Sequence, residues 1–346
     1  NEIVFTPDSR SLLVGPLDKG ALLYDLEGKL LRTYTNSASP VTSVGFSPFS
    51  PDSLFLVTGG EGKHLRLWDA VTGDAAPLTA NPGALPGEGA ISAPVAFYPN
   101  DPVLLIGHAG DSLYLLDLYS FEEYAYDKPA FSSTSAVAWG GDHFLTSDFN
   151  GNVQCWRGNE NGELILEWDK KIPANYVTSL EVAPDGVHFL SAMSRDWIPS
   201  VAHFKTEGPE QPYDNAGHPA TLRRVDNFAE VRNYGKTSNL AIISSDGKYV
   251  ATNEGEEHGI SLFQYENARE LFHVSLGQVR VMSLAFSADG RTIAAGCSDN
   301  IAREYDLKGK LIREYKGHLS AVRAVAYSPF GEYLLTGSSD NTAKLW

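Results

Sequence analysis

The fold is decided by 281-VMSLAFSADGRTIAAGCSDNIAREYDLKGKLIREYKGH-318, which is followed by a second copy of the same pattern, 322-VRAVAYSPFGEYLLTGSSDNTAKLW-346. Each copy has a short alternating apolar run, a turn rich in Ser, Pro, Asp and Gly, and a second apolar run. A Ser-Asp-Asn turn and a third run ending in an aromatic residue follow. Short runs bounded by such turns are typical of antiparallel β-strands.

The same pattern recurs along the whole chain. Each copy can be aligned on the last large apolar residue before its first turn, and the successive intervals are 41, 51, 42, 43, 61, 43 and 41 residues. These anchor residues are Phe5, Phe46, Phe97, Trp139, Val182, Ile243, Phe286 and Tyr327. Most intervals are close to the roughly 40–45 residues of a four-stranded propeller blade. A thin sheet cannot bury both faces alone, so we expect the units to shield one another around a common axis.

The sequence therefore predicts an all-β fold, a β-propeller of four-stranded antiparallel blades with eight repeat units. The expected units are 1–36, 37–80, 88–128, 130–171, 172–216, 217–277, 278–318 and 319–346, and the last lacks its fourth strand. The alternative is a seven-bladed ring in which 190–235 is a large insertion. Within that region only 220–234 has apolar residues at helical spacing.

Composition narrows the function. The chain has 346 residues, of which 42% are hydrophobic, and this content disfavours a mainly disordered chain. Its formal net charge of −16 disfavours nucleic acid or an anionic membrane as the main partner. Two cysteines exclude a disulfide scaffold, and no apolar stretch is long enough to span a bilayer. Since the segment begins at Asn1 without a leader and stops at Trp346, we expect it to be part of a larger chain. The expected location is cytoplasmic, with the compartment left open for a eukaryotic protein.

Catalytic and metal-binding motifs are missing from the pattern. The nine histidines show neither a His-Glu-x-x-His motif nor close spacing to a cysteine, and no Gly-x-Ser-x-Gly elbow occurs. The sequence therefore predicts no catalytic residue, no metal site and no cofactor. A channel-sited hydrolase or lyase, or a small-molecule binder that uses the central channel, remains the alternative function.

The repeats resemble the WD40-repeat β-propeller family over essentially the whole chain. The residues that carry the resemblance are Gly317-His318, Ser339-Asp340-Asn341, Lys344-Leu345-Trp346 and Trp68-Asp69. The resemblance implies a structural hydrogen-bond network of His318, Asp340, Trp346 and a hydroxyl from Thr336 or Ser338. Asp299, Trp68 and Asp69 are its expected members in other units. Such a network satisfies polar groups that the blades bury.

The resemblance also implies a binding face. In this family the second-to-third and fourth-to-first loops line one end of the blades, where partners dock. The candidate protein-binding residues there are Tyr176, Arg280, Arg195, Trp197, His64, Phe149 and His258. Aromatic and arginine side chains are enriched among interface residues that carry binding energy. We expect a non-catalytic scaffold, sensor or receptor module that binds a protein or peptide, with basic segments that suit the net charge.

Overall fold

The structure is a computed structural model. It describes residues 2–346 apart from 16–19, 35–40, 47–54, 61–63, 71, 76–94, 98–102, 108–111, 118–122, 128–133, 141–142, 149–150, 159–163, 173–175, 195–217 and 255–257. The described residues form eight antiparallel sheets, six with four strands and two with three. They contain no helix that could cross a membrane. We number the sheets 1 to 8 in chain order.

Sheets 1 to 4 occupy the first half of the chain. Sheet 1 contains β1 (Glu2–Phe5), β2 (Ser11–Gly15), β3 (Ala21–Asp25) and β4 (Leu30–Tyr34). Sheet 2 contains β5 (Val41–Phe46), β6 (Phe55–Gly60) and β7 (His64–Asp69). Sheet 3 contains β8 (Val95–Phe97), β9 (Val103–Gly107), β10 (Ser112–Asp117) and β11 (Glu123–Asp127). Sheet 4 contains β12 (Thr134–Gly140), β13 (His143–Asp148), β14 (Asn152–Gly158) and β15 (Leu164–Lys171).

Sheets 5 to 8 continue the same meander. Sheet 5 contains β16 (Tyr176–Val182), β17 (His188–Ser194), β18 (Ala220–Arg224) and β19 (Glu230–Tyr234). Sheet 6 contains β20 (Ala241–Ile243), β21 (Tyr249–Glu254), β22 (Gly259–Gln264) and β23 (Glu270–Ser275). Sheet 7 contains β24 (Val281–Phe286), β25 (Thr292–Cys297), β26 (Ile301–Asp306) and β27 (Leu311–Lys316). Sheet 8 contains β28 (Val322–Tyr327), β29 (Leu334–Ser338) and β30 (Ala343–Leu345).

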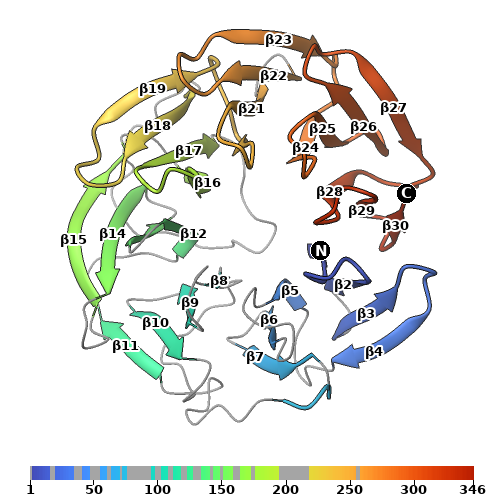
Figure 1. The fold of residues 1–346 in the computed structure, drawn as a ribbon, viewed down its shortest axis with the longest axis horizontal. Coiled ribbons are helices and arrows are strands. Elements are labelled where there is room, and N and C mark those ends of the chain that lie inside the picture. The colour runs from blue at the N-terminus through green and yellow to red at the C-terminus, as the bar shows by residue number, and fades with distance from the viewer. Residues whose placement is uncertain are drawn as a thin grey trace, which may run out of the picture.

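The sheets are arranged radially in a ring, with the first strand of each sheet innermost (Figure 1). Each first strand contacts the first strand of the next sheet, and β28 contacts β1, so the circle closes between sheets 8 and 1. Phe5 and Leu12 from sheet 1 form one buried cluster with Leu335 from sheet 8. The predicted propeller fold is therefore confirmed.

Burial declines from the inside of a sheet to its outer edge. In sheet 7, the second strand β25 is buried at five consecutive positions, whereas the fourth strand β27 is exposed at all positions but Tyr315. The inner strands have neighbouring sheets on both faces, so a continuous apolar run is suited to that position. The outer strand has no further strand beyond it in its sheet, and water reaches nearly all of its residues.

Polar contacts also cross the seams between first strands. At the seam between sheets 5 and 6, Ser179 Oγ donates to the carbonyl of Ala241 at 3.1 Å. The carboxylate of Glu181 accepts the backbone N–H of Ile243 at 3.0 Å. Burial raises the pKa of Glu181 to about 7, against the opposing effect of that hydrogen bond. Glu181 is thus a partly buried titratable group at an inter-sheet seam.

The region 172–277 differs from the sequence-based expectation in two ways. Residues 220–234 are not a helix but the third and fourth strands of sheet 5, so they are not an insertion outside the sheets. The boundary predicted between residues 216 and 217 is also wrong, because sheet 5 extends to Tyr234. The helical spacing arose from a strand, a turn and a strand: Val225 and Phe228 lie in the turn and pack against the core between sheets 4 and 5.

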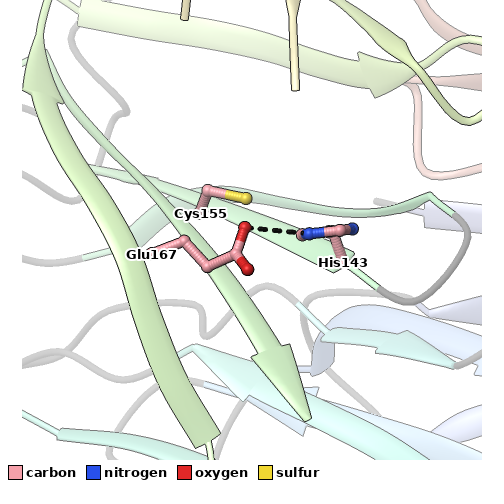
Figure 2. Close-up of side chains that lie close together, drawn as sticks. All are labelled: His143, Cys155 and Glu167. Carbon is pink, nitrogen blue, oxygen red and sulfur yellow. Dashed lines mark hydrogen bonds and ion pairs between the residues drawn. The ribbon is translucent and has the colours of Figure 1, made fainter. Parts of the chain in front are cut away.

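A β-bulge recurs in the fourth strand of five sheets. In each, the register skips one fourth-strand residue opposite the end of the third strand. The skipped residues are Leu31, Glu167, Val231, Leu271 and Ile312. Only Glu167 in this set is charged, and it lies beside His143 and Cys155 (Figure 2).

Candidate functional site

The loop face is the end of the ring that carries the second-to-third and fourth-to-first connections. In an antiparallel meander these connections must lie at the same end of each sheet. His64 begins β7 and Tyr176 begins β16, so both lie at this end. Phe149, Arg195 and Trp197 lie outside the described residues. Their part in binding stays a prediction.

Arg280 enters the first strand of sheet 7 and its side chain is exposed. Its backbone N–H donates to Ser298 Oγ at 2.9 Å, and its carbonyl accepts the N–H of Ser298 at 2.9 Å. Ser298 belongs to the turn between β25 and β26. These two hydrogen bonds join the start of the first strand to the neighbouring turn of the same sheet and hold the backbone of Arg280 in place.

The loop face of sheet 8 is built in the same way. The N–H of Ser339 donates to the carbonyl of Ala321 at 3.0 Å, and Arg323 Nε donates to Ser339 Oγ at 2.7 Å. Leu319 is 87% exposed beside this turn. An exposed leucine on a fixed backbone can contact a partner at little cost in ordering entropy.

His258 occupies the turn before β22 in sheet 6. Its φ is +46°, in the left-handed region, and its carbonyl accepts the N–H of Leu276 at 2.8 Å. Leu276 lies in the connection from sheet 6 to sheet 7. The backbone of His258 thus joins two adjacent loops of the loop face.

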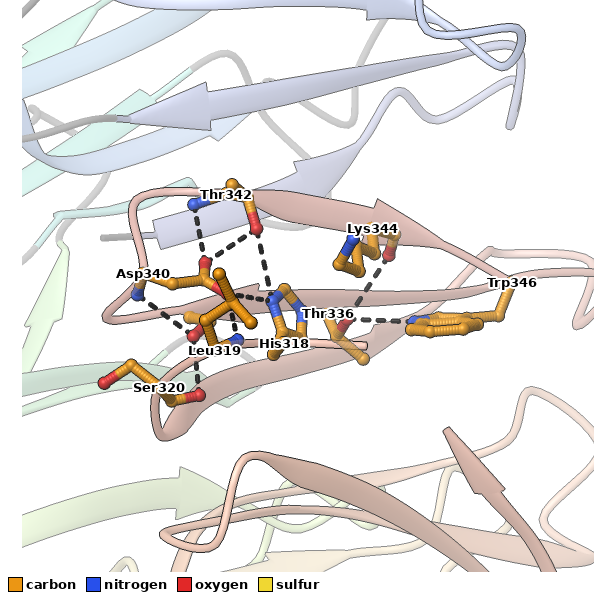
Figure 3. Close-up of polar contacts among 9 residues, drawn as sticks. His318, Leu319, Ser320, Thr336, Asp340, Thr342, Lys344 and Trp346 are labelled. Carbon is orange, nitrogen blue, oxygen red and sulfur yellow. Dashed lines mark hydrogen bonds and ion pairs between the residues drawn. The ribbon is translucent and has the colours of Figure 1, made fainter. Parts of the chain in front are cut away.

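The polar network of sheet 8 links four side chains in a chain of hydrogen bonds (Figure 3). Asp340 Oδ2 lies 2.9 Å from His318 Nδ1, and His318 Nε2 lies 2.8 Å from Thr336 Oγ1. Trp346 Nε1 donates to the same hydroxyl at 2.9 Å. A neutral imidazole that donates from Nδ1 and accepts at Nε2 satisfies all these contacts. Of the two candidate hydroxyls, Thr336 fills this place, whereas Ser338 Oγ donates to the carbonyl of Ser320.

Asp340 anchors both the turn and the network. Burial alone would raise the pKa of its carboxyl, but the hydrogen bonds from Thr342, the backbone of Leu319 and His318 hold that pKa well below its usual range. The carboxylate therefore stays charged in any ordinary buffer. It fixes the connection at residues 317–319 against the turn that precedes β30.

The hydrogen bond from the Trp346 indole N–H to the Thr336 hydroxyl recurs at equivalent positions of other sheets. Trp68 Nε1 donates to Thr58 Oγ1 at 3.0 Å in sheet 2, and Trp156 Nε1 donates to Thr146 Oγ1 at 3.1 Å in sheet 4. Each pair joins the second strand to the third. The repeat therefore preserves this contact even in sheets that lack the Gly-His pair.

In sheet 5 an arginine replaces the tryptophan. Arg223 Nη1 donates to Ser191 Oγ at 2.7 Å, and its Nη2 pairs with Glu230 at 2.9 Å. Its side chain is only 3% exposed and stacks over Phe228. Burial lowers the pKa of the Arg223 guanidinium, and Glu230 opposes that shift. Sequence reasoning missed this residue, although aligning the third strands would have placed Arg223 at the tryptophan position.

Asp299 and Asp69 make other polar contacts in their own sheets. Asp299 pairs with the guanidinium of Arg303, with 2.9 Å between Oδ1 and Nη1. Asp69 accepts the N–H of Thr72 at 2.7 Å, as a turn cap. The six predicted network residues thus lie in or beside sheets 2, 7 and 8.

One group of side chains in the described part of the chain has the donors and spacing to hold a metal ion. His143, Cys155 and Glu167 place one donor atom each within 4.8 Å of the others. Spacing in the sequence did not indicate this group, because its members lie on three adjacent strands. The sequence-based prediction of no metal site was drawn from spacing along the chain, which does not report the approach of His143 to Cys155 in space.

Known proteins match the repeats in part of the chain. The family model described as "WD domain, G-beta repeat" matches residues 28–69, 271–306 and 309–346. Each match starts near or within the fourth strand of one sheet and runs through the third strand of the next. The sequence repeat is thus offset by one strand from the sheet.

Similar proteins include the mouse "Periodic tryptophan protein 2 homolog", 24% identical over 49% of this chain and 20% of that protein. The Xenopus tropicalis "U3 small nucleolar RNA-associated protein 15 homolog" is 37% identical over 18% of this chain and 12% of its own length. The rat "Telomerase protein component 1" is 23% identical over 99% of this chain and 12% of its own length. The chain therefore spans a fifth or less of these relatives.

Among solved structures, the computationally designed Ika8 protein has a TM-score of 0.76 at 17% identity, covering 99% of this chain and 94% of that one. At this identity the likeness concerns the fold alone. Together with the three matched regions and the closed ring of meanders, it places the repeats in a known architecture. Residues 28–69, 271–306 and 309–346 therefore match the WD40 repeat, and the antiparallel sheets that contain them belong to a β-propeller.

Proposed function

We propose that this chain is a non-catalytic interaction module with eight blades that binds a protein or peptide on its loop face. The observation that carries the proposal is that hydrogen bonds to a neighbouring turn hold the loop-face backbone in place, at Arg280 and again beside Leu319. Loops that are ordered before binding lose little entropy when a partner docks. Recognition rather than turnover is the activity that such a surface supports.

The exposed side chains of sheets 7 and 8 support a protein partner. Arg280 and Arg323 present guanidinium groups, and Leu319 presents an apolar surface. Arginine can bind carboxylates and carbonyls in a planar fork, and apolar anchors surrounded by polar groups are typical of interface centres. This part of the face suits a partner segment with acidic or carbonyl groups near an apolar side chain.

The net charge of the chain indicates which charge the other segments of the partner should carry. At −16, the chain favours basic segments in a partner and disfavours nucleic acid as the main ligand. The RNA association in the name of the Xenopus relative belongs to that protein. We propose a cytoplasmic location for this chain, and imaging of the tagged full-length protein tests it against a nucleolar one.

A charge reversal on each face tests the proposal. The chain is immobilised, and bound proteins are identified by quantitative mass spectrometry for wild type, Arg280→Glu and Arg291→Glu. Arg291 lies in the opposite-end turn of the same sheet with its side chain 83% exposed, so it is the matched control.

We expect Arg280→Glu to lose specific partners at least about tenfold, as for an interface residue worth more than 1.4 kcal/mol. Arg291→Glu should retain them. Leu319→Ser and Phe330→Ser repeat the comparison with apolar residues, because Phe330 is 70% exposed in the opposite-end turn of sheet 8. Equal loss in both members of each pair, or none in either, would contradict a loop-face site.

A further inference from the structure

Three potential metal ligands meet on adjacent strands of sheet 4. His143 on β13 and Glu167 on β15 approach to 2.9 Å between Nε2 and Oε2 (Figure 2). Cys155 on β14 lies between them, and the three donor atoms are within 4.8 Å of one another. The thiol is buried, while the imidazole and carboxylate are 21% and 23% exposed. Solvent therefore reaches the group through the imidazole and the carboxylate.

Comparison with the other sheets shows that packing alone does not explain this set. Cys155 precedes the third-strand tryptophan, and six other sheets have leucine at this position: Leu23, Leu67, Leu115, Leu222, Leu262 and Leu345. In the seventh sheet it is Glu304, whose carboxylate accepts two tyrosine hydroxyls. Leucine thus fills this seam in most sheets, and sheet 4 has a thiol instead.

Glu167 departs from the repeat in the same way. It is the bulge residue of β15, and the equivalent residues of the other four bulged sheets are Leu31, Val231, Leu271 and Ile312. Sheet 4 therefore differs from its neighbours at two positions, and at both the new side chain carries a metal donor. His143 on β13, the second strand of the sheet, completes the set.

The donor types and their spacing suit a zinc-like ion. Thiolate, imidazole and carboxylate are all zinc ligands, with Zn–S about 2.3 Å and Zn–N about 2.0–2.1 Å. A tetrahedral site then separates its donors by about 3.3–3.6 Å. At present His143 Nε2 and Glu167 Oε2 are 2.9 Å apart, and all three donor atoms lie within 4.8 Å of one another. Small side-chain rotations would open the His143–Glu167 contact and admit the ion.

Arg157 gives the carboxylate an orientation. Its Nε lies 3.0 Å from Glu167 Oε1, so it holds one oxygen while Oε2 faces His143. Groups that hold the far side of a ligand in this way fix its direction and tune its affinity. The arginine also neutralises part of the carboxylate charge, so affinity for the ion rests mainly on the thiolate and the imidazole.

We propose that His143, Cys155 and Glu167 bind one zinc-class transition-metal ion, with water in the fourth position. Binding releases the thiol proton of Cys155 to solvent, because the thiolate is the ligand. The ion would tie the second, third and fourth strands of sheet 4 together beside the seam with sheet 5, where Cys155 belongs to the buried cluster. This site is independent of loop-face binding.

Cobalt titration of the purified, metal-free chain tests the proposal. Cobalt(II) bound by a thiolate gives an intense near-ultraviolet charge-transfer band, which a nitrogen and oxygen site does not give. We expect wild type to bind one equivalent with this band and Zn²⁺ to displace it. Cys155→Ser should abolish the band, whereas Cys297→Ser, which alters the other buried cysteine, should retain it.

His143→Gln and Glu167→Gln should each weaken Zn²⁺ binding by at least about tenfold in calorimetric titration. These side chains are partly exposed, so the two variants decide the matter even where Cys155→Ser fails to fold by circular dichroism. Absence of the band in wild type, its persistence in Cys155→Ser, or unchanged affinity in both glutamine variants would overturn the site.

Discussion

Replacing Thr336 with valine should destabilise the chain, whereas the same replacement of Thr252 should not. Both threonines are buried at the equivalent second-strand position of their sheets. Thr336 Oγ1 contacts Trp346 Nε1 and His318 Nε2. In sheet 6 the third-strand residue is Phe263, which has no donor, and Thr252 Oγ1 has no hydrogen-bond partner among the described residues.

The magnitudes follow from the groups left unpaired. Thr336→Val leaves the His318 imidazole nitrogen, on a fully buried side chain, and the half-buried indole N–H without partners. Each buried group left unsatisfied costs about 1–3 kcal/mol, so we expect a loss of about 2–4 kcal/mol in the free energy of unfolding. Thr252→Val removes a hydroxyl whose burial is uncompensated, so stability should stay level or rise by about 1 kcal/mol.

Urea unfolding followed by far-ultraviolet circular dichroism measures both variants against wild type. The comparison holds where the m-values agree, because the midpoints then report stability alone. Equal midpoints for the two variants would refute the reasoning, as would a loss in Thr252→Val as large as that in Thr336→Val.

Three further predictions concern single residues. Ser191→Ala should cost about 1–3 kcal/mol in urea unfolding, because Arg223 Nη1 loses its partner while buried; no change would show that the hydroxyl contributes nothing. The pKa of Glu181 is about 7 in the folded chain against an ordinary 4.5, so the folded state binds its proton more tightly than the unfolded state does. The free energy of unfolding of the wild type therefore falls as pH rises from about 4.5 to 7. Glu181→Gln should therefore gain stability relative to wild type by up to about 3 kcal/mol between pH 4.5 and pH 8, and a pH-independent difference would contradict this. Gly309→Ala should lower the melting temperature in calorimetry and cost about 1–3 kcal/mol, since φ is +78° and the new Cβ would lie 2.8 Å from the Phe272 ring; an unchanged melting temperature would count against it.

Repetition made the ring predictable from sequence. The eight anchor residues all fall within first strands, from Phe5 in β1 to Tyr327 in β28, because the same alternation and turn chemistry recur in every unit. In sheet 7, for example, Ser287 and Asp289 bind the turn backbone, and Gly290 adopts a φ of +66°. Such local signals need no knowledge of distant residues.

Two features were hidden because they depend on neighbours in space. At 220–234, the turn and the bulge at Val231 interrupt the two-residue period of the strands, so the apolar spacing imitates a helix. His143, Cys155 and Glu167 are separated by 12 residues each, and only strand pairing brings them together. The positions of His64, Tyr176, Arg280 and His258 along the chain indicate which end of a strand they occupy, but contact with a partner follows from no local pattern and stays a prediction.

Hydrogen–deuterium exchange of the chain, alone and with the partner captured on it, tests the loop-face account most directly. We predict slower exchange at 276–281 and 317–323 in the complex, since these segments carry Arg280 and Leu319. The opposite-end turns at 287–292 and 328–333 should exchange at the same rate in both samples. Protection confined to those turns or to the outer strands would contradict recognition by the loop face.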